Sequence, residues 1–238
     1  MTIKIFVGTS ANGEDGEAEL TLEYTLKKHS SQPIEVTWMR QSKDPHSPFN
    51  GWKTKTWATP FSGFRWAIPE LCNFQGRAIY MDVDMICLAD IAELINVDMA
   101  GKPALGKPYN GVIETSVMLM DCEALKKHMP SIDNMKQTDK VQVSMSWKVK
   151  PLMGKLDNRW NVFDGEYYDV SNMWILHYTK MSSQPWQPKW FRGQVEGHSR
   201  PELAKLWYRL RDEALSNGYT VPDGYEHFGP YDIVGKVA

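Results

Sequence analysis

The sequence predicts a single α/β domain over residues 1–238, built on a central, mostly parallel sheet flanked by helices. The chain opens with an apolar run at 3–8, a helical pattern at 17–29 and a second apolar run at 34–38. This strand–helix–strand order is typical of α/β domains, in which a crossover helix joins parallel strands. A length of 238 residues lies at the upper end for one domain, and nothing in the sequence requires two.

The later elements are predicted from their apolar patterns. In chain order they are a helix at 61–71, a strand at 77–81, a short helix at 90–95, strands at 104–105 and 117–120, a helix at 123–128, a strand at 174–177 and an amphipathic helix at about 200–217. The stretch between the second strand and the first of these helices, residues 40–60, is expected to be a long functional loop. The last helix is expected to dock on the domain, and its basic and aromatic side chains also suit peripheral contact with a membrane surface.

Composition and charge argue against several classes of protein. The 27 basic and 29 acidic residues give a net charge of −2, whereas proteins that bind nucleic acid are usually basic. Cys72, Cys87 and Cys122 are odd in number and widely spaced, which predicts reduced core thiols in a cytoplasmic protein. No apolar run approaches the roughly 18–20 residues of a transmembrane helix, and no signal-peptide pattern is expected at the N-terminus. The sequence does not indicate an oligomeric state.

The strongest local feature is a pair of aspartates at the end of an apolar strand. In Arg77-Ala78-Ile79-Tyr80-Met81-Asp82-Val83-Asp84, the two carboxylates are one residue apart and point to one side of an extended chain. Like charges this close need a partner, and a divalent cation with oxygen ligands is a natural one. Ligands of open α/β sheets bind beyond the carboxyl ends of strands, so a metal site is expected here. The alternative is a solvated Asp-x-Asp turn without a function.

Three more residues are candidates for the same site. His177 ends a late apolar strand, where a neutral imidazole can complete a site begun by two carboxylates, although a single histidine after a strand is more often structural. Lys180 follows it, and a lysine ammonium can neutralise phosphate charge. Arg65 lies among aromatic residues on a predicted helix, where it either pairs with Glu70 or reaches the aspartates or a diphosphate.

The glycines after the first strand do not form a known phosphate-binding loop. Gly8, Gly13 and Gly16 fit neither G-x-G-x-x-G nor G-x-x-x-x-G-K-[ST], and the chain has no G-x-S-x-G elbow. Rossmann oxidoreductase, P-loop and hydrolase functions therefore lose support.

The order of these motifs resembles one enzyme family. The aspartate strand, followed by Asp90-Ile91-Ala92-Glu93-Leu94, resembles the signature region of the glycogenin-like enzymes, glycosyltransferase family 8. The stretch Phe64–Leu71 is similar to the family's R-[FL]-x-x-P-x-L helix. The late pair Leu176-His177-Tyr178-Thr179 and Gln184-Pro185-Trp186 is similar to the family's H-[FY]-x-G…K-P-W motif. The resemblance covers about residues 3–190.

The resemblance implies a fold of the GT-A type and a set of site residues. It implies that Asp82, Asp84 and His177 bind the metal ion and that Arg65 helps to organise the donor site. It further implies that Asp139 faces the transferred sugar and the acceptor. The remaining donor-binding residues that it implies are Val7, Gly8, Thr9 and Val83.

The resemblance also implies the cofactors and the reaction. These are Mn²⁺ or Mg²⁺, a nucleotide-sugar donor linked to UDP, a glycan or other hydroxyl acceptor, and transfer with retention. The chain departs from the family pattern at Glu114-Thr115-Ser116, where Asn-x-Gly is usual, at Lys140, where Gln is expected, and at Gln184, where a phosphate-binding Lys is usual. Lys180, which replaces the usual Gly, is expected to take over that phosphate contact. The catalytic candidates are therefore Asp139, Arg65 and Lys180.

Two alternatives remain open at this point. A haloacid-dehalogenase-like phosphatase also places D-x-D after a strand and would use Asp82 as its nucleophile. A carbohydrate-binding protein on the same fold, with a donor site that has decayed, would explain the departures at Thr115 and Gln184.

Overall fold

The computed structural model describes residues 2–186, 196–226 and 228 of the chain. Within these residues the central sheet has the strand order β2-β1-β3-β6-β5-β7. Its strands are β1 (Ile3–Gly8), β2 (Ile34–Met39), β3 (Arg77–Asp82), β5 (Ala104–Tyr109), β6 (Val112–Asp121) and β7 (Gly154–Lys155). β1 is parallel to β2 and β3, and β7 is parallel to β5, whereas β6 is antiparallel to both of its neighbours. This mixed, mostly parallel sheet confirms the predicted α/β class.

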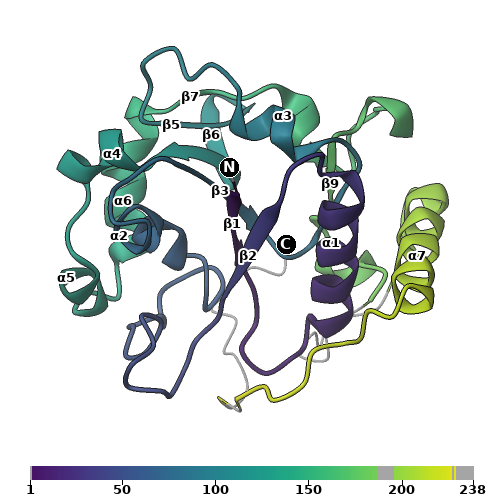
Figure 1. Ribbon diagram of the computed structural model, residues 1–238, viewed down its shortest axis with the longest axis horizontal. Coiled ribbons are helices and arrows are strands. Elements are labelled where there is room, and N and C mark those ends of the chain that lie inside the picture. Colours follow the sequence, from purple (N-terminus) through teal and green to yellow (C-terminus); the bar gives the residue numbers. More distant parts are fainter. Residues whose placement is uncertain (1, 187–195, 227, 229–238) are drawn as a thin grey trace.

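Helices cover both faces of this sheet (Figure 1). They are α1 (Gly16–His29), α2 (Ile68–Leu71), α3 (Ile91–Ile95), α4 (Cys122–Leu125), α5 (Ile132–Lys136), α6 (Val141–Val149) and α7 (Pro201–Ser216). The 3₁₀ turns are η1 (Phe64–Ala67), η2 (Lys126–His128), η3 (Lys150–Leu152), η4 (Asn158–Asn161), η5 (Val170–Asn172) and η6 (Met181–Ser183). In Figure 1, α1 and α7 lie on one side of the sheet, and α2, α4 and α6 lie on the other.

Alternation along the strands assigns side chains to these two layers. Ile5 and Ile79 belong to the core that includes α1 and α7, whereas Phe6 and Tyr80 belong to the core under α2 and α6. Successive strand residues point to opposite faces, so the alternation also places Asp82 on the side of Tyr80. The first aspartate of the motif therefore emerges toward the layer that contains η1.

A second, smaller sheet completes the fold and was not predicted. Its strands, in the order β4-β9-β8, are β4 (Met85–Cys87), β9 (Ile175–His177) and β8 (Val162–Phe163). β4 is antiparallel to β9, and β8 is parallel to it. β4 begins directly after the Asp-x-Asp motif. The small sheet therefore brings β8 and β9, which are distant in sequence, next to that motif.

The helix expected at 61–71 was only partly right. The structure has η1 followed directly by α2, and the chain before Phe64 is a series of turns. Pro69 has no N–H and lies in the first turn of α2, which favours a break at that point. A Cβ on Gly63 would lie 2.4 Å from the ring of Trp57, so the turn before η1 is packed against the loop at 40–60.

The strands expected at 104–105 and 117–120 are parts of a longer hairpin. β5 and β6 continue to a two-residue turn at Asn110 and Gly111, where φ is 46° and 80°. Positive φ at both positions is typical of the tight turn that joins antiparallel strands. Helix α6 was missed, although its buried residues Val141, Met145 and Val149 have the spacing of one helical face.

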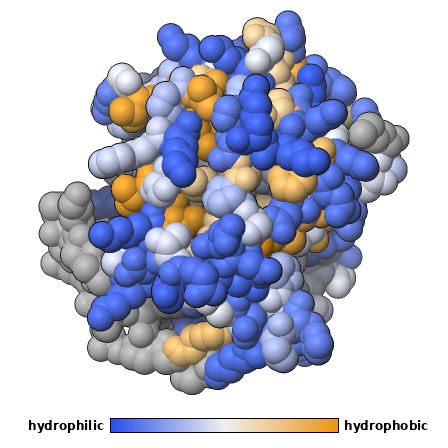
Figure 2. Space-filling view, turned by 90° about the vertical axis from the view of Figure 1, so that its left-hand side faces the viewer, coloured by the Kyte–Doolittle hydropathy of each residue, from blue (hydrophilic) through white to orange (hydrophobic). Residues whose placement is uncertain are grey.

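The three cysteines are buried and unpaired, as predicted. In the part of the chain that the structure describes, no helix is long and apolar enough to cross a membrane. The face formed by α4, α5 and α6 is mainly hydrophilic, with apolar residues in separate small patches (Figure 2).

Candidate functional site

Arg65 and the first aspartate of the motif meet at the carboxyl end of β3. Nη2 of Arg65 lies 3.2 Å from Oδ1 of Asp82, and the guanidinium carbon lies 4.4 Å from the centre of the Tyr80 ring. The Tyr80 hydroxyl donates a further hydrogen bond to Asp82. Glu70, the other candidate partner of Arg65, instead accepts a hydrogen bond from the backbone of α5. The partner of Arg65 is therefore Asp82.

The departure at Thr115 does not leave the site without hydrogen bonds. Nη1 of Arg65 donates to the Thr115 hydroxyl at 3.0 Å and to its carbonyl, while Nε donates to the carbonyl of Ser62 at 2.8 Å. Arg65 is 4% exposed, so these acceptors satisfy a buried cation. The contacts of Nε and Nη1 with Ser62 and Thr115 fix the Arg65 guanidinium, and with it the position of Nη2, which binds Asp82.

The pairing of β4 with β9 brings His177 to the second aspartate. Met85 lies opposite His177 in this antiparallel pair, and Asp84 is the residue before Met85. Nε2 of His177 lies 3.2 Å from Oδ1 of Asp84. The N–H of Tyr178 donates to the carbonyl of Asp84 at 2.9 Å, which extends the pairing by one residue. Backbone hydrogen bonds thus fix the two chain positions from which the Asp84 and His177 side chains extend.

Asp82, Asp84 and His177 form a set of metal-ligand groups. Each contributes one ligand atom, and these atoms all lie within 4.8 Å of one another. Oδ1 of Asp84 is buried and makes no hydrogen bond to any of the described residues, although Nε2 of His177 lies near it. A buried, unpaired carboxylate oxygen is costly unless a cation binds it. Two carboxylates and an imidazole therefore fit a divalent cation.

Burial and neighbouring charge both shift the pKa values in this cluster. Burial raises the pKa of Asp82 to about 6, the Arg65 guanidinium opposes that shift, and the Asp84 carboxylate adds to it. Burial by itself lowers the pKa of His177, but the neighbouring Asp84 carboxylate raises it, and the net shift is upward. The Asp84 carboxylate thus contributes to both upward shifts, and a bound divalent cation would oppose its negative charge.

Asn161, which sequence reasoning missed, holds the imidazole from the other side. Its Oδ1 lies 3.1 Å from Nδ1 of His177, and its Nδ2 donates to the Ser116 hydroxyl at 2.9 Å. Asn161 is fully buried at the end of η4. The available sequence signal is a polar amide between the apolar residues Trp160 and Val162, which does not by itself indicate its partner.

Gln184 holds the second aspartate. Its Nε2 donates to Oδ2 of Asp84 at 3.3 Å and to the carbonyl of Tyr178 at 2.8 Å, and the side chain is buried. The residue that departs from the lysine of the family motif is therefore a neutral support for Asp84. The sequence did not predict this contact, because 100 residues separate the two side chains.

The residues expected to bind the nucleotide lie at the carboxyl end of β1. Val7 and Thr9 are buried, and the Thr9 hydroxyl donates to Glu19 at 2.6 Å. The carbonyl of Gly8 accepts a hydrogen bond of 3.1 Å from the N–H of Val83, the residue between the two aspartates. A Cβ on Gly8 would lie 2.7 Å from the Tyr80 hydroxyl, so glycine is required for this close approach. The end of β1 is thus joined directly to the Asp-x-Asp turn.

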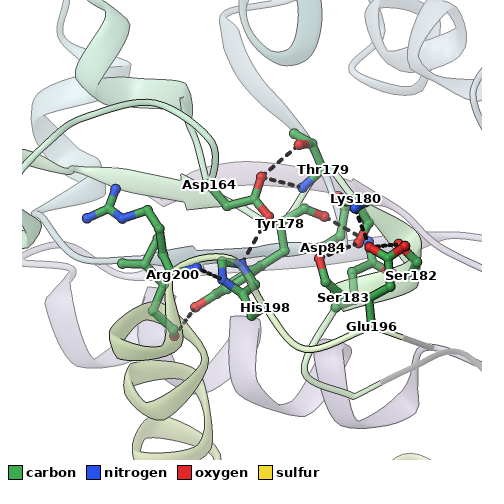
Figure 3. A network of polar contacts seen from close by, with 12 residues as sticks. Asp84, Asp164, Tyr178, Thr179, Lys180, Ser182, Ser183, Glu196, His198 and Arg200 are labelled. Carbon is green, nitrogen blue, oxygen red and sulfur yellow. Dashed lines mark hydrogen bonds and ion pairs between the residues drawn. The ribbon is translucent and has the colours of Figure 1, made fainter.

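The other two predicted residues make no direct contact with the three candidate ligands. Lys180 is mostly exposed and forms an ion pair with Glu196 (Figure 3). Asp139 lies in the turn before α6, where its carbonyl accepts a hydrogen bond from Thr56 of the loop at 40–60.

A polar network supports the chain that follows β9 (Figure 3). Asp164 accepts hydrogen bonds from the hydroxyl and the N–H of Thr179, at 2.7 and 3.2 Å. Its other oxygen lies 3.1 Å from Nε2 of His198. These contacts anchor the segment that carries Lys180 and leads to Gln184.

A known protein family matches the part of the chain that carries the site. The family model for glycosyl transferase family 8 matches residues 53–189, which include the Arg65, Asp-x-Asp and His177 motifs. Protein CDI of Arabidopsis thaliana is 26% identical in an alignment 237 positions long, which covers 88% of this chain and 86% of that protein.

Solved glycosyltransferases share the fold. The apo structure of the bifunctional glycosyltransferase WbbM matches 91% of this chain with a TM-score of 0.60 and 11% identity. GlyE of Streptococcus pneumoniae TIGR4 matches 94% with a TM-score of 0.58 and 14% identity. The galactosyltransferase LgtC, solved with donor and acceptor sugar analogues, matches 89% with a TM-score of 0.57 and 10% identity. The matched region is 50% of the WbbM chain, 66% of the GlyE chain and 96% of the LgtC chain.

Proposed function

This chain belongs to glycosyl transferase family 8 and is a glycosyltransferase, and from that premise we propose that Asp82, Asp84 and His177 hold a divalent cation that binds a nucleotide-sugar donor. The observation that carries the proposal is the cluster of three ligand atoms, in which the buried Oδ1 of Asp84 accepts no hydrogen bond from the described residues. Family membership sets aside the phosphatase alternative, and the cluster of three ligand groups argues against a decayed donor site.

The bound cation would neutralise charge on the diphosphate of the departing nucleotide. Arg65 has a supporting role in this proposal, because each of its three side-chain nitrogens already donates to Asp82, Thr115 or Ser62. It keeps Asp82 ionised and oriented toward the cation. Lys180 is exposed enough to leave Glu196 and bind a donor phosphate, and Asp139 is proposed to face the acceptor hydroxyl.

The donor, the metal and the stereochemistry are proposed on the resemblance of the motifs to the family. They are a UDP-linked sugar, Mn²⁺ and transfer with retention to a glycan or other hydroxyl acceptor. The imidazole ligand additionally supports Mn²⁺ over Mg²⁺. A cytoplasmic location is proposed on the three buried, unpaired cysteines, and the exposed Tyr208 and Arg209 of α7 support peripheral contact with a membrane.

A donor screen tests this function. The protein is incubated with UDP-, GDP- and ADP-sugars, with Mn²⁺ or with a chelator, and slow hydrolysis of the donor is measured. We expect hydrolysis of at least one nucleotide-sugar that requires Mn²⁺ and is lost in Asp84→Asn. Asp98→Asn is the matched control, because Asp98 is exposed and binds only a neighbouring backbone N–H among the described contacts. Hydrolysis that is equal in the chelator, or equal in Asp84→Asn, would contradict the proposal.

A further inference from the structure

The chain beyond α7 returns to the carboxyl edge of the central sheet. Residues 219–226, here called the C-terminal strap, run from α7 past the N-terminal end of α1 (Figure 1, yellow). At the start of the strap the ring of Tyr219 packs edge-on against Tyr24 of α1, with 5.3 Å between ring centres. Further along, the strap contacts the loop that follows β1 and the segment that follows β2.

The loop after β1 is shaped to receive the strap. A Cβ on Gly13 would lie 2.4 Å from the ring of Tyr225, and a Cβ on Gly16 would lie 2.7 Å from Val221. Gly13 also has a φ of 77°, which a larger residue would strain to adopt. These two glycines match no phosphate-binding motif, and the structure instead explains them by close packing with the strap.

A buried carboxylate connects the strap to the end of β1. Glu19 of α1 has a fully buried side chain and accepts three hydrogen bonds from different parts of the fold. The donors are the Thr9 hydroxyl at 2.6 Å, Nη2 of Arg40 at 2.8 Å and the Tyr225 hydroxyl at 3.0 Å. The Arg40 guanidinium also lies 4.9 Å from the centre of the Tyr225 ring. A buried carboxylate needs all of its donors, so removal of one disturbs the others.

A second contact fixes the strap to the segment after β2. The Glu226 carboxylate accepts a hydrogen bond of 3.0 Å from the Ser42 hydroxyl and another from the N–H of Lys43. The strap therefore connects the segments that follow the carboxyl ends of two neighbouring parallel strands, β1 and β2.

The end of β1 is also part of the proposed donor site. The carbonyl of Gly8 binds the N–H of Val83, between the two aspartates, and the next residue, Thr9, binds Glu19. A nucleoside attached to a diphosphate at these aspartates extends over the carboxyl ends of adjacent parallel strands. The turn at Gly8 and Thr9 is thus held by the metal-site turn on one side and by Glu19 on the other.

We propose that the C-terminal strap completes the nucleoside side of the donor site, with Tyr225 as a positioning residue that acts through Glu19 on the turn at Gly8 and Thr9. The inference rests on the proposed function. It assigns the strap to the nucleoside part of the donor and not to the metal ion or the phosphates.

Binding measurements on the full chain test the strap. Titration calorimetry measures the affinity for Mn²⁺ alone, for pyrophosphate with Mn²⁺ and for UDP with Mn²⁺, in wild type and in Tyr225→Phe and Tyr225→Ala. Tyr225→Phe keeps the ring on Gly13 and loses only the hydrogen bond to Glu19. We expect UDP affinity to fall about tenfold in Tyr225→Phe and at least as much in Tyr225→Ala. Affinity for Mn²⁺ and for pyrophosphate should stay within about twofold of wild type.

Tyr219→Ala is the matched control, because it removes an aromatic ring from the same segment at a place that contacts only α1 among the described aromatic pairs. We expect it to lower Tm without changing UDP affinity at a temperature well below Tm. UDP affinity that is unchanged in both Tyr225 variants, or an equal loss for pyrophosphate, would overturn the role of the strap. Wild type is also titrated with GDP and ADP in the presence of Mn²⁺, and if it binds none of the three nucleotides the proposed function itself fails.

Discussion

Nδ1 of His177 lies 3.1 Å from Oδ1 of Asn161, in a fully buried contact between β9 and η4. The amide nitrogen of Asn161 donates to Ser116, so its oxygen is the acceptor that faces the imidazole. A proton on Nδ1 satisfies that acceptor and leaves the lone pair of Nε2 directed toward Asp84. The contact therefore selects the histidine tautomer that can bind a metal ion.

Asn161→Ala should weaken metal binding because this selection is lost. We expect roughly a 10- to 100-fold loss of Mn²⁺ affinity, the range found for residues that orient metal ligands. Titration calorimetry with Mn²⁺ measures it. Asn96→Ala is the control, since Asn96 binds the Ala92 carbonyl of α3 and makes no described contact with the site. An Asn161→Ala protein that binds Mn²⁺ as wild type does would show that the tautomer is fixed in another way.

Arg65→Ala should destabilise the protein even without metal. It removes the buried cation that pairs with Asp82 and leaves a carboxylate without its charge partner. The expected loss in the free energy of unfolding is roughly 3–5 kcal/mol. Urea denaturation measures it, with Lys27→Ala as the control, because Lys27 forms an exposed ion pair with Glu23 for which only about 0.3–0.5 kcal/mol is expected. Losses of equal size in the two variants would contradict the account of Arg65.

Lys180→Ala tests the proposed phosphate contact. We expect KM for the nucleotide-sugar to rise about 3- to 10-fold, because a charge-assisted hydrogen bond to phosphate is lost. The Tm should change little, since Lys180 is mostly exposed. Glu196→Gln frees Lys180 from its ion pair and should leave KM unchanged or lower. Lys205→Ala, on the exposed side of α7, is the matched control. A KM that is unaffected in Lys180→Ala would remove this residue from the donor site.

Asp15 should make stability depend on pH. Burial raises its pKa to about 7, against hydrogen bonds that involve Ser10 and Trp186. An unfolded aspartate titrates near pH 4, so between about pH 4 and 7 the folded state retains a proton that the unfolded state has released. The contribution of Asp15 to stability therefore falls as pH rises through this window and stays low above it.

Asp15→Asn removes this titration and can still accept the Trp186 hydrogen bond. We expect the variant to gain stability relative to wild type as pH rises from 4.5 to 8, by at most about 4 kcal/mol. Urea unfolding at several pH values, with a chelator present, measures the difference. Parallel pH profiles for the two proteins would contradict it.

Local pattern was sufficient to predict part of the site. The apolar strand that ends in Asp82 and Asp84 is formed by neighbouring residues, and the run before His177 predicts a strand end in the same way. The sequence alone left Glu70 and the aspartates as equally good partners for Arg65. Only the resemblance to the family placed Arg65 near the aspartates. The fold class followed from the strand–helix–strand opening, which is also local.

Contacts between distant segments could not be predicted. Asn161 and Gln184 reach the site because β4, β8 and β9 form a small sheet, and the three residues of β4 and the two of β8 leave almost no pattern in a sequence. The link from Tyr225 to Glu19 spans 206 positions and depends on the path of the chain after α7. The strand expected at 77–81 was nearly correct, whereas the helix expected at 61–71 was only partly right, because turns packed against Trp57 at Gly63 precede Phe64.

The most direct test of the central claim is a titration of Mn²⁺ and UDP into wild type and Asp84→Asn. If Asp82, Asp84 and His177 hold a cation that binds the donor diphosphate, wild type binds one Mn²⁺ per chain, UDP tightens that binding, and both effects disappear in Asp84→Asn. UDP that binds equally well in the presence of a chelator, or Mn²⁺ that binds Asp84→Asn as tightly as wild type, would contradict the claim.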